Sequence, residues 1–186
     1  MTSTISSGMD VIEYLTGQHD EIKVLFSLVN SSDGTAKQEA FYSLRRLLAV
    51  HETAEEEIVH PAARRAFPDD PSLVDARLLE ENEAKKILSD LEDLDVDSPE
   101  FEEKFQLLQN GVLVHARAEE EQEFPLLADA LDQGQLDKMR AAAVLAEKMA
   151  PTRPHPGVES ATANLLAGPF AAMIDRTRDA LSGKSR

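Results

Sequence analysis

Four long stretches of this chain place apolar residues at spacings of three and four, and clusters of turn-forming residues separate them. That spacing is typical of amphipathic helices. Asp10 with Glu13 can cap the first helix, and Ser98 can cap the fourth, with Pro99 in its first turn. Short connections make consecutive helices antiparallel neighbours, so the pattern predicts an all-α fold, an antiparallel up-down four-helix bundle. The four predicted helices cover residues 11–29, 36–66, 73–94 and 100–131.

The remainder of the chain follows a different pattern. Residues 136–149 predict a short fifth helix. The prolines of residues 150–157 favour extended backbone, and residues 169–181 again suit a helix. We therefore expect residues 1–149 to form the bundle with its fifth helix. Residues 150–186 should form a Pro-rich turn and a C-terminal helical arm packed on the bundle or on a second subunit.

The charge balance limits the partners of the chain. Lysine plus arginine number 19 and aspartate plus glutamate 35, which gives a net charge of −16. Nucleic acids and anionic membranes attract basic surfaces, so neither is an expected partner, whereas acidity suits a protein that binds cations. The chain has no cysteine, which leaves histidine and carboxylate as the main metal ligands. No secretory leader or membrane-spanning run stands out, so we expect a cytoplasmic protein.

One motif occurs twice. HETAEEEIVHP covers residues 51–61 and HARAEEEQEFP covers residues 115–125, and the two stretches agree in a histidine, an alanine, three glutamates and a proline. A proline inside a helix removes a backbone hydrogen bond, so Pro61 and Pro125 predict a kink or an end at the bundle rim.

Helical phase shows which side chains of the motif face the core. At about 100° per residue, Glu55 lies about 40° from His51, on the apolar side of its helix. Glu119 has the same relation to His115, and His19 shares the apolar face of the first helix. Three histidines and two glutamates are thus predicted to point into the middle of one bundle.

The same phase assigns other residues to the outside. His60 falls about 180° from His51, so we expect it on the outer face, and Glu52, Glu56 and Glu57 fan outward. Leu126 falls about 20° from His115 and should face the core.

Inward carboxylates are costly unless they are paired or bind a cation. Two facing His-x-x-x-Glu units suit a pair of metal ions, with each glutamate bridging and each histidine terminating one metal. The alternative is that an acidic run is a solvated face and a lone histidine is a hydrogen-bonded core residue. We prefer that alternative for His60. We also prefer it for Glu56, Glu57, Glu120 and Glu121, which should lie on the surface or behind the metal ligands. It fails for the repeated pair, where residue type, spacing and phase coincide twice.

These motifs, with His19 in QHDEI, resemble the hemerythrin-like HHE cation-binding domain over about residues 9–145. The resemblance implies a four-helix bundle around two non-heme iron ions with an oxo or hydroxo bridge. It also implies binding or sensing of dioxygen, nitric oxide or peroxide. Carried over onto this sequence, the implied ligands are His19, His51, Glu55, His115 and Glu119.

The third helix departs from the family pattern, because it contains no histidine. The segment EENEAKKILSDLE, residues 80–92, places Glu81 where the family has a histidine, so Glu81 completes the predicted ligand set. The apolar face of this helix is centred nearer Glu80 and Ala84, which keeps Glu80 as the alternative. His155 in the tail is a further, less favoured ligand.

Three classes of function fit these features. The preferred one is a di-iron protein, a monomer or homodimer, that binds or senses dioxygen, nitric oxide or peroxide as its small-molecule ligand. The alternative is an enzyme, a di-iron oxidase or a peroxide-degrading catalyst. A structural protein with a vestigial metal site is the third.

Overall fold

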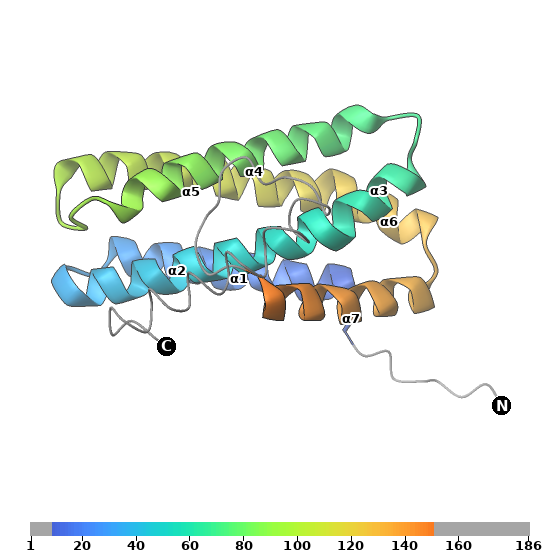
Figure 1. Ribbon diagram of the computed structural model, residues 1–186, viewed down its shortest axis with the longest axis horizontal. Coiled ribbons are helices and arrows are strands. Elements are labelled where there is room, and N and C mark those ends of the chain that lie inside the picture. The colour runs from blue at the N-terminus through green and yellow to red at the C-terminus, as the bar shows by residue number, and fades with distance from the viewer. Residues whose placement is uncertain (1–8, 151–186) are drawn as a thin grey trace.

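The computed structural model describes residues 9–150, and four long helices lie side by side in an up-down order (Figure 1). The residues in that range form no strand. The predicted all-α helical fold is confirmed, and the arrangement of the long helices is compatible with the predicted four-helix bundle. Its long helices are α1 (Val11–Asn30), α2 (Gly34–Ala54), α4 (Pro71–Glu92) and α5 (Pro99–Ala118).

The second and fourth predicted helices are each built of three segments. α2 continues through a π-helical turn, η1 (Glu55–Val59), into α3 (His60–Ala66). α5 continues in the same way through η2 (Glu119–Glu123) into α6 (Phe124–Ala130). Each repeated motif therefore spans the end of a long helix, a π-turn and the start of a short helix.

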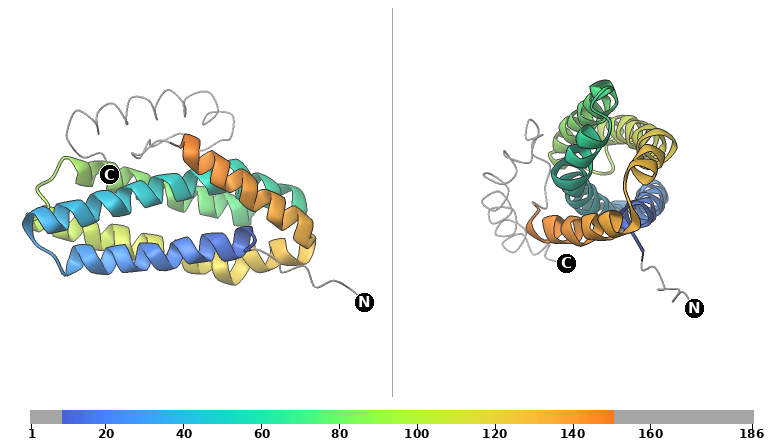
Figure 2. Two further views of the ribbon diagram at one scale, coloured as in Figure 1. Left: turned by 90° about the horizontal axis from the view of Figure 1, so that it is seen from below. Right: turned by 90° about the vertical axis from the view of Figure 1, so that its right-hand side faces the viewer.

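The fifth helix, α7 (Gln133–Met149), packs against α1, α2 and η1 on the outside of the bundle (Figure 2). Its Glu147 ties it to α1, because Tyr14 Oη donates to Glu147 Oε2 at 2.6 Å and Gln18 Nε2 donates to Glu147 Oε1 at 2.8 Å. The predicted C-terminal arm, with His155, lies outside the described residues.

Both predicted helix caps are present. The Asp10 carboxylate accepts from the backbone of Ile12 and Glu13, and Ser98 Oγ accepts from the N–H of Phe101. These contacts satisfy backbone donors that have no partner within the helix. None of the helices between residues 9 and 150 is long and apolar enough to cross a membrane.

The core consists of two apolar clusters with a buried polar layer between them. One cluster is rich in aromatic rings, among them Phe26, Phe41, Phe101 and Phe105. The other contains smaller side chains together with Phe124. Burying each large side chain stabilises the fold by about 1.5–3 kcal/mol, so both clusters hold the helices in place around the polar layer.

Candidate metal centre

The polar layer brings together the six residues singled out in the sequence. Four ligand atoms within 4.8 Å of one another define each of two groups. The double-histidine group consists of His19, His51, Glu55 and Glu119. The single-histidine group consists of Glu55, Glu81, His115 and Glu119. Glu55 and Glu119 belong to both groups, and each has 0% of its surface exposed.

The distances show that the Glu119 carboxylate faces both groups. Glu119 Oε2 lies 3.3 Å from His19 Nε2, and Glu119 Oε1 lies 3.4 Å from His115 Nε2. His51 Nε2 lies 3.2 Å from Glu55 Oε1 and 3.1 Å from His19 Nε2. A carboxylate with its two oxygens turned to different groups has the arrangement needed to bridge two cations.

Each of the three candidate histidine ligands has an acceptor oxygen close to Nδ1, the ring nitrogen that faces away from the centre. The pairs are His19 Nδ1 with Glu120 Oε1 at 2.8 Å, His51 Nδ1 with Gln18 Oε1 at 2.7 Å, and His115 Nδ1 with Glu80 Oε2 at 3.0 Å. Because these oxygens can only accept, each Nδ1 carries a proton and donates it. Such contacts fix the ring and aim Nε2 at a metal.

The electrostatics of the layer couple the histidines to the carboxylates. Burial lowers the pKa of His19 and of His115, but the neighbouring carboxylates outweigh burial, and both pKa values are raised. Burial raises the pKa of Glu55 and of Glu119, yet the adjacent imidazoles hold both below the ordinary value. Protons on the imidazoles therefore compensate the carboxylate charge wherever a cation does not, so protons and metal compete for this layer.

Each repeated motif contains a π-turn that starts at its own inward glutamate. The N–H of His60 bonds to the carbonyl of Glu55, and the N–H of Phe124 bonds to the carbonyl of Glu119, with a wider spacing than in an α-helix. One extra residue in the turn sets the rotation of the following helix back by about 100°. The predicted kink is thus a π-turn that precedes each proline.

The prediction that His60 faces outward is wrong, and the π-turn is the reason. The set-back moves His60 from about 180° to about 80° from His51, into the bundle. Its ring is 2% exposed, with Nε2 2.5 Å from Glu81 Oε1 and Nδ1 3.1 Å from Glu123 Oε1. Burial lowers the pKa of His60, but the charge of Glu81 and the contact with Glu123 raise it well above its ordinary value.

The second π-turn has the same effect on the residues that follow it. Leu126 was expected in the core, yet 43% of it is exposed, while its neighbour Leu127 is fully buried. The one-residue offset between prediction and structure is the residue that the π-turn inserts.

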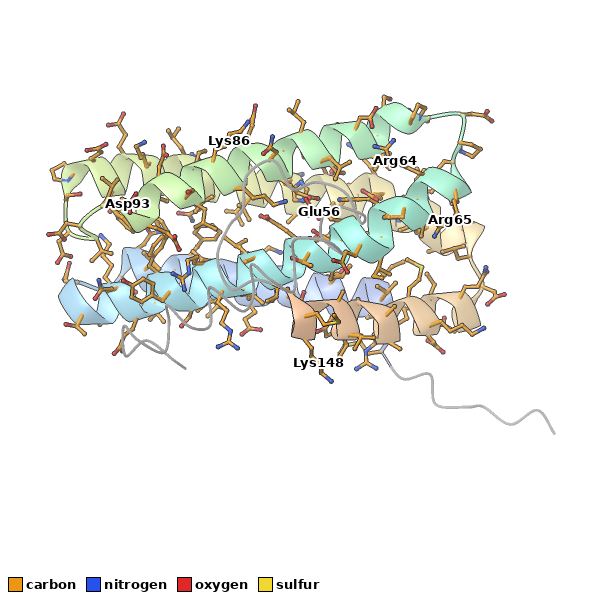
Figure 3. The ribbon with its side chains drawn as sticks, viewed as in Figure 1. Glu56, Arg64, Arg65, Lys86, Asp93 and Lys148 are labelled. Carbon is orange, nitrogen blue, oxygen red and sulfur yellow. The ribbon has the colours of Figure 1, made fainter. Side chains whose placement is uncertain are left out.

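Glu52 and Glu56, expected on the outer face, are buried as well. The side of α2 and η1 that carries them meets α4, where Lys85 lies as their counter-charge. Lys85 Nζ contacts Glu56 Oε1 and lies 3.9 Å from Glu52 Oε2. Figure 3 shows Glu56 in the space between η1 and α4. A helix flanked by two neighbours in a bundle has little outer face, which the phase of one helix does not reveal.

On α4, the two neighbouring glutamates occupy different positions. Glu81 is 1% exposed, and its Oε1 lies 3.9 Å from His115 Nε2. The Glu80 side chain is 34% exposed, contacts the outer nitrogen of His115 and accepts from Arg77 at 3.1 Å. Of the two alternatives left open by the sequence, Glu81 lies among the candidate ligands and Glu80 behind one of them.

Comparison of the sequence with models of known protein families gives a match that covers the candidate ligands. The family model "Hemerythrin HHE cation binding domain" matches residues 10–127, more than half of the chain. The chain belongs to the hemerythrin HHE cation-binding domain family. All six candidate ligands lie within the matched residues.

Two individual proteins resemble this HHE-domain chain. A protein named "DNA nickase" from Nostoc sp. is 28% identical over 133 residues, which are 70% of this chain and 37% of that protein. The chain therefore spans little more than a third of the length of that relative. A crystal structure of a hemerythrin HHE cation binding domain-containing protein, an Rv2633c homolog from Mycobacterium kansasii, matches with a TM-score of 0.68 and 17% identity. That match covers 92% of this chain and 99% of the other. At that identity the likeness shows the shared fold.

The HHE-domain residues of this chain fit a pair of metal ions. Within the described residues, both carboxylate oxygens of Glu55 and of Glu119 are buried without a hydrogen-bond partner, and so are Glu81 Oε2 and His115 Nε2. A buried carboxylate without donors is costly unless a cation compensates it. Imidazole and carboxylate together suit iron, and also zinc or manganese. The donor set therefore satisfies the requirements of a two-metal centre.

Proposed function

We propose that this protein holds two non-heme iron ions and binds dioxygen, nitric oxide or peroxide there. His19 and His51 would hold one iron, and Glu81 and His115 the other. Glu55 and Glu119 would be shared between them. The observation that supports the proposal is the sharing itself, because both common carboxylates are buried, accept no hydrogen bond within the described residues and belong to both groups.

The residues around the ligands perform separate tasks. When bound, an iron pair supplies a redox-active centre with room for a small ligand. Gln18, Glu80 and Glu120 orient the imidazoles through their outer nitrogens. The two apolar clusters exclude water from either side of the layer.

A peroxide-degrading or oxidase activity is the second candidate, and His60 favours it. This imidazole lies between the carboxylates of Glu81 and Glu123, and all three are buried. It can take a proton on one nitrogen and release one from the other. Steady-state peroxide consumption by iron-loaded protein, compared with His60→Ala at equal iron content, distinguishes a catalyst from a sensor.

We do not propose nucleic acid as a partner of this protein. The name "DNA nickase" belongs to a longer relative, and this chain matches only 37% of that relative's length. A net charge of −16 opposes binding to a phosphate backbone. We propose a cytoplasmic protein, monomeric or homodimeric, whose ligand is a small molecule.

Metal analysis of protein expressed in iron-rich medium, together with its visible spectrum, tests the proposal. We expect close to an iron pair per chain and an absorption band that zinc-loaded protein lacks. Thermal melting with and without iron is the second measurement, because an ion that binds only the folded state stabilises it. Protein that takes up zinc alone, or no metal, would overturn the proposal. Unchanged melting would favour a vestigial site.

A further inference from the structure

A small cavity adjoins the polar layer on the side of the aromatic cluster. It offers about 20 Å³ to the centre of a water-sized molecule, which is enough for a molecule of one to three atoms. Its apolar wall includes Ile22, Leu48 and Val112. The residues of the polar layer that line it include His115 and Glu81.

The cavity walls contain unpartnered polar atoms. His115 Nε2 and Glu81 Oε2 are both buried and have no hydrogen-bond partner among the described residues. His19 and His51 line the cavity as well. A ligand in the cavity would therefore meet residues of both groups. The lining also includes Glu52, Glu80 and Glu81, whose carboxylates disfavour an anion, so the cavity suits a small uncharged molecule.

On the side of α4 and α5, residues that solvent can reach line the cavity. Its lining includes Gly111, which is exposed on α5, and Ala84 and Glu80, which are half-buried on α4. Gly111 lies one helical turn before His115, and Ala84 lies almost one turn after Glu81. Both small residues thus adjoin a residue of the single-histidine group on its own helix.

Neither backbone conformation nor packing requires glycine at position 111. Its φ is not positive, and a Cβ atom placed there would meet nothing within 4 Å. Glycine inside a helix is also less favourable than alanine. The absence of a side chain leaves open space at the outer end of the cavity.

We propose that Gly111 and Ala84 form the entrance through which a small uncharged ligand, of the size of dioxygen or nitric oxide, reaches the centre. The open space above Gly111 sets the width of the entrance, so the entrance should admit small molecules. A larger side chain at position 111 would fill that space. This inference rests on the proposed function for its ligand, while the entrance itself is a property of the helices.

Gly17 provides a matched control for position 111. It is also exposed within a long helix, a Cβ atom there also meets nothing within 4 Å, and it does not line the cavity. Gly111→Leu should slow the association of nitric oxide with the ferrous protein by about tenfold or more in stopped-flow absorption. Gly111→Ala should give a smaller decrease, and Gly17→Leu should bind at the wild-type rate. Iron content and visible spectrum should be the same in all four proteins.

A second measurement does not depend on iron. The rate at which xenon under pressure enters and leaves the cavity, followed through the methyl NMR signals of Leu48 and Val112, should be the same in the isolated wild type and in Gly17→Leu, and much lower in Gly111→Leu. Equal nitric oxide rates in wild type and Gly111→Leu, with full iron in both, would overturn the entrance and leave the iron proposal standing. A wild type that carries no iron but exchanges xenon at a rate that depends on Gly111 would support the entrance and overturn the iron proposal.

Discussion

The double-histidine group and the single-histidine group share two carboxylates and differ in the residues that complete them. His19 and His51 complete the first, whereas His115 and Glu81 complete the second. A carboxylate in place of an imidazole adds a negative charge and a harder ligand, which favours the more highly charged state of a bound ion. Two groups built on one repeated motif are thus unequal because α4, which has no copy of the motif, supplies Glu81. We expect the two irons to differ in affinity and in reduction potential.

The largest expected effect comes from a residue that both groups share. Glu119→Gln keeps the shape of the side chain but removes the charge, so both groups lose a ligand. Iron content measured by elemental analysis should fall by most of its wild-type value.

Glu121→Gln is the control, because it changes a glutamate of the same acidic run that pairs on the surface with Arg117. It should retain full iron. Equal losses in the two variants would mean that Glu119 does not hold the pair together.

Changes at Glu81 should separate the groups. Glu81→Ala should lose roughly half of the iron, because the double-histidine group keeps all its residues. Glu81→His should keep both irons and raise the reduction potential measured by redox titration, since it removes a negative charge. His51→Ala should remove the other share.

Glu80→Ala tests the register on α4. It removes the contact to the outer nitrogen of His115 and should weaken binding without removing a ligand. Loss of iron in Glu80→Ala together with full iron in Glu81→Ala would assign the ligand to Glu80 instead.

A smaller and selective loss is expected from His60→Ala. His60 holds the Glu81 carboxylate, so its removal should lower the affinity of the single-histidine group by about 10-fold to 100-fold in chelator competition. Gln18→Leu should act in the same way on the double-histidine group, where Gln18 supports His51. If both variants weaken the same iron, the two groups are not separate.

The smallest expected effect is the pH dependence of the thermal stability of the metal-free protein. The raised pKa values of His19, His60 and His115 contribute stability that is full below about pH 6.5 and is lost as pH rises through the folded values. The lowered pKa values of Glu55 and Glu119 contribute stability above about pH 4.5 that is lost on acidification. Melting temperatures should therefore peak at about pH 5 to 6, and iron-loaded protein should keep its stability to higher pH. A metal-free protein that melts highest above pH 8 would contradict this assignment.

Much of the fold could be predicted from the sequence, because helix phase and turn residues are local signals. The spacing of apolar residues gave the long helices, and Asp10 and Ser98 marked two of their starts. His51, Glu55, His115 and Glu119 could be found because each lies before or at the start of the π-turn in its helix, where regular helical phase still holds. His19 could be found because α1 contains no π-turn.

The residues beyond the π-turns could not be placed in this way. A helical phase that is extended through a π-turn is wrong by one residue. For this reason His60 was predicted to face outward and Leu126 to face the core. The burial of Glu56 depends on Lys85 from another helix, and Gln18 precedes His19 without any pattern that marks it as a support. Such contacts become visible only when the helices are packed together.

The extra residue in each π-turn also affects how this chain should be aligned with other proteins. A π-turn holds one residue more than a regular α-helical turn. An alignment that compares this chain with a relative lacking the turn needs a one-residue gap between Glu55 and Pro61, and another between Glu119 and Pro125. Without those gaps, His60 and Glu123 would be compared with residues on the wrong side of the helix.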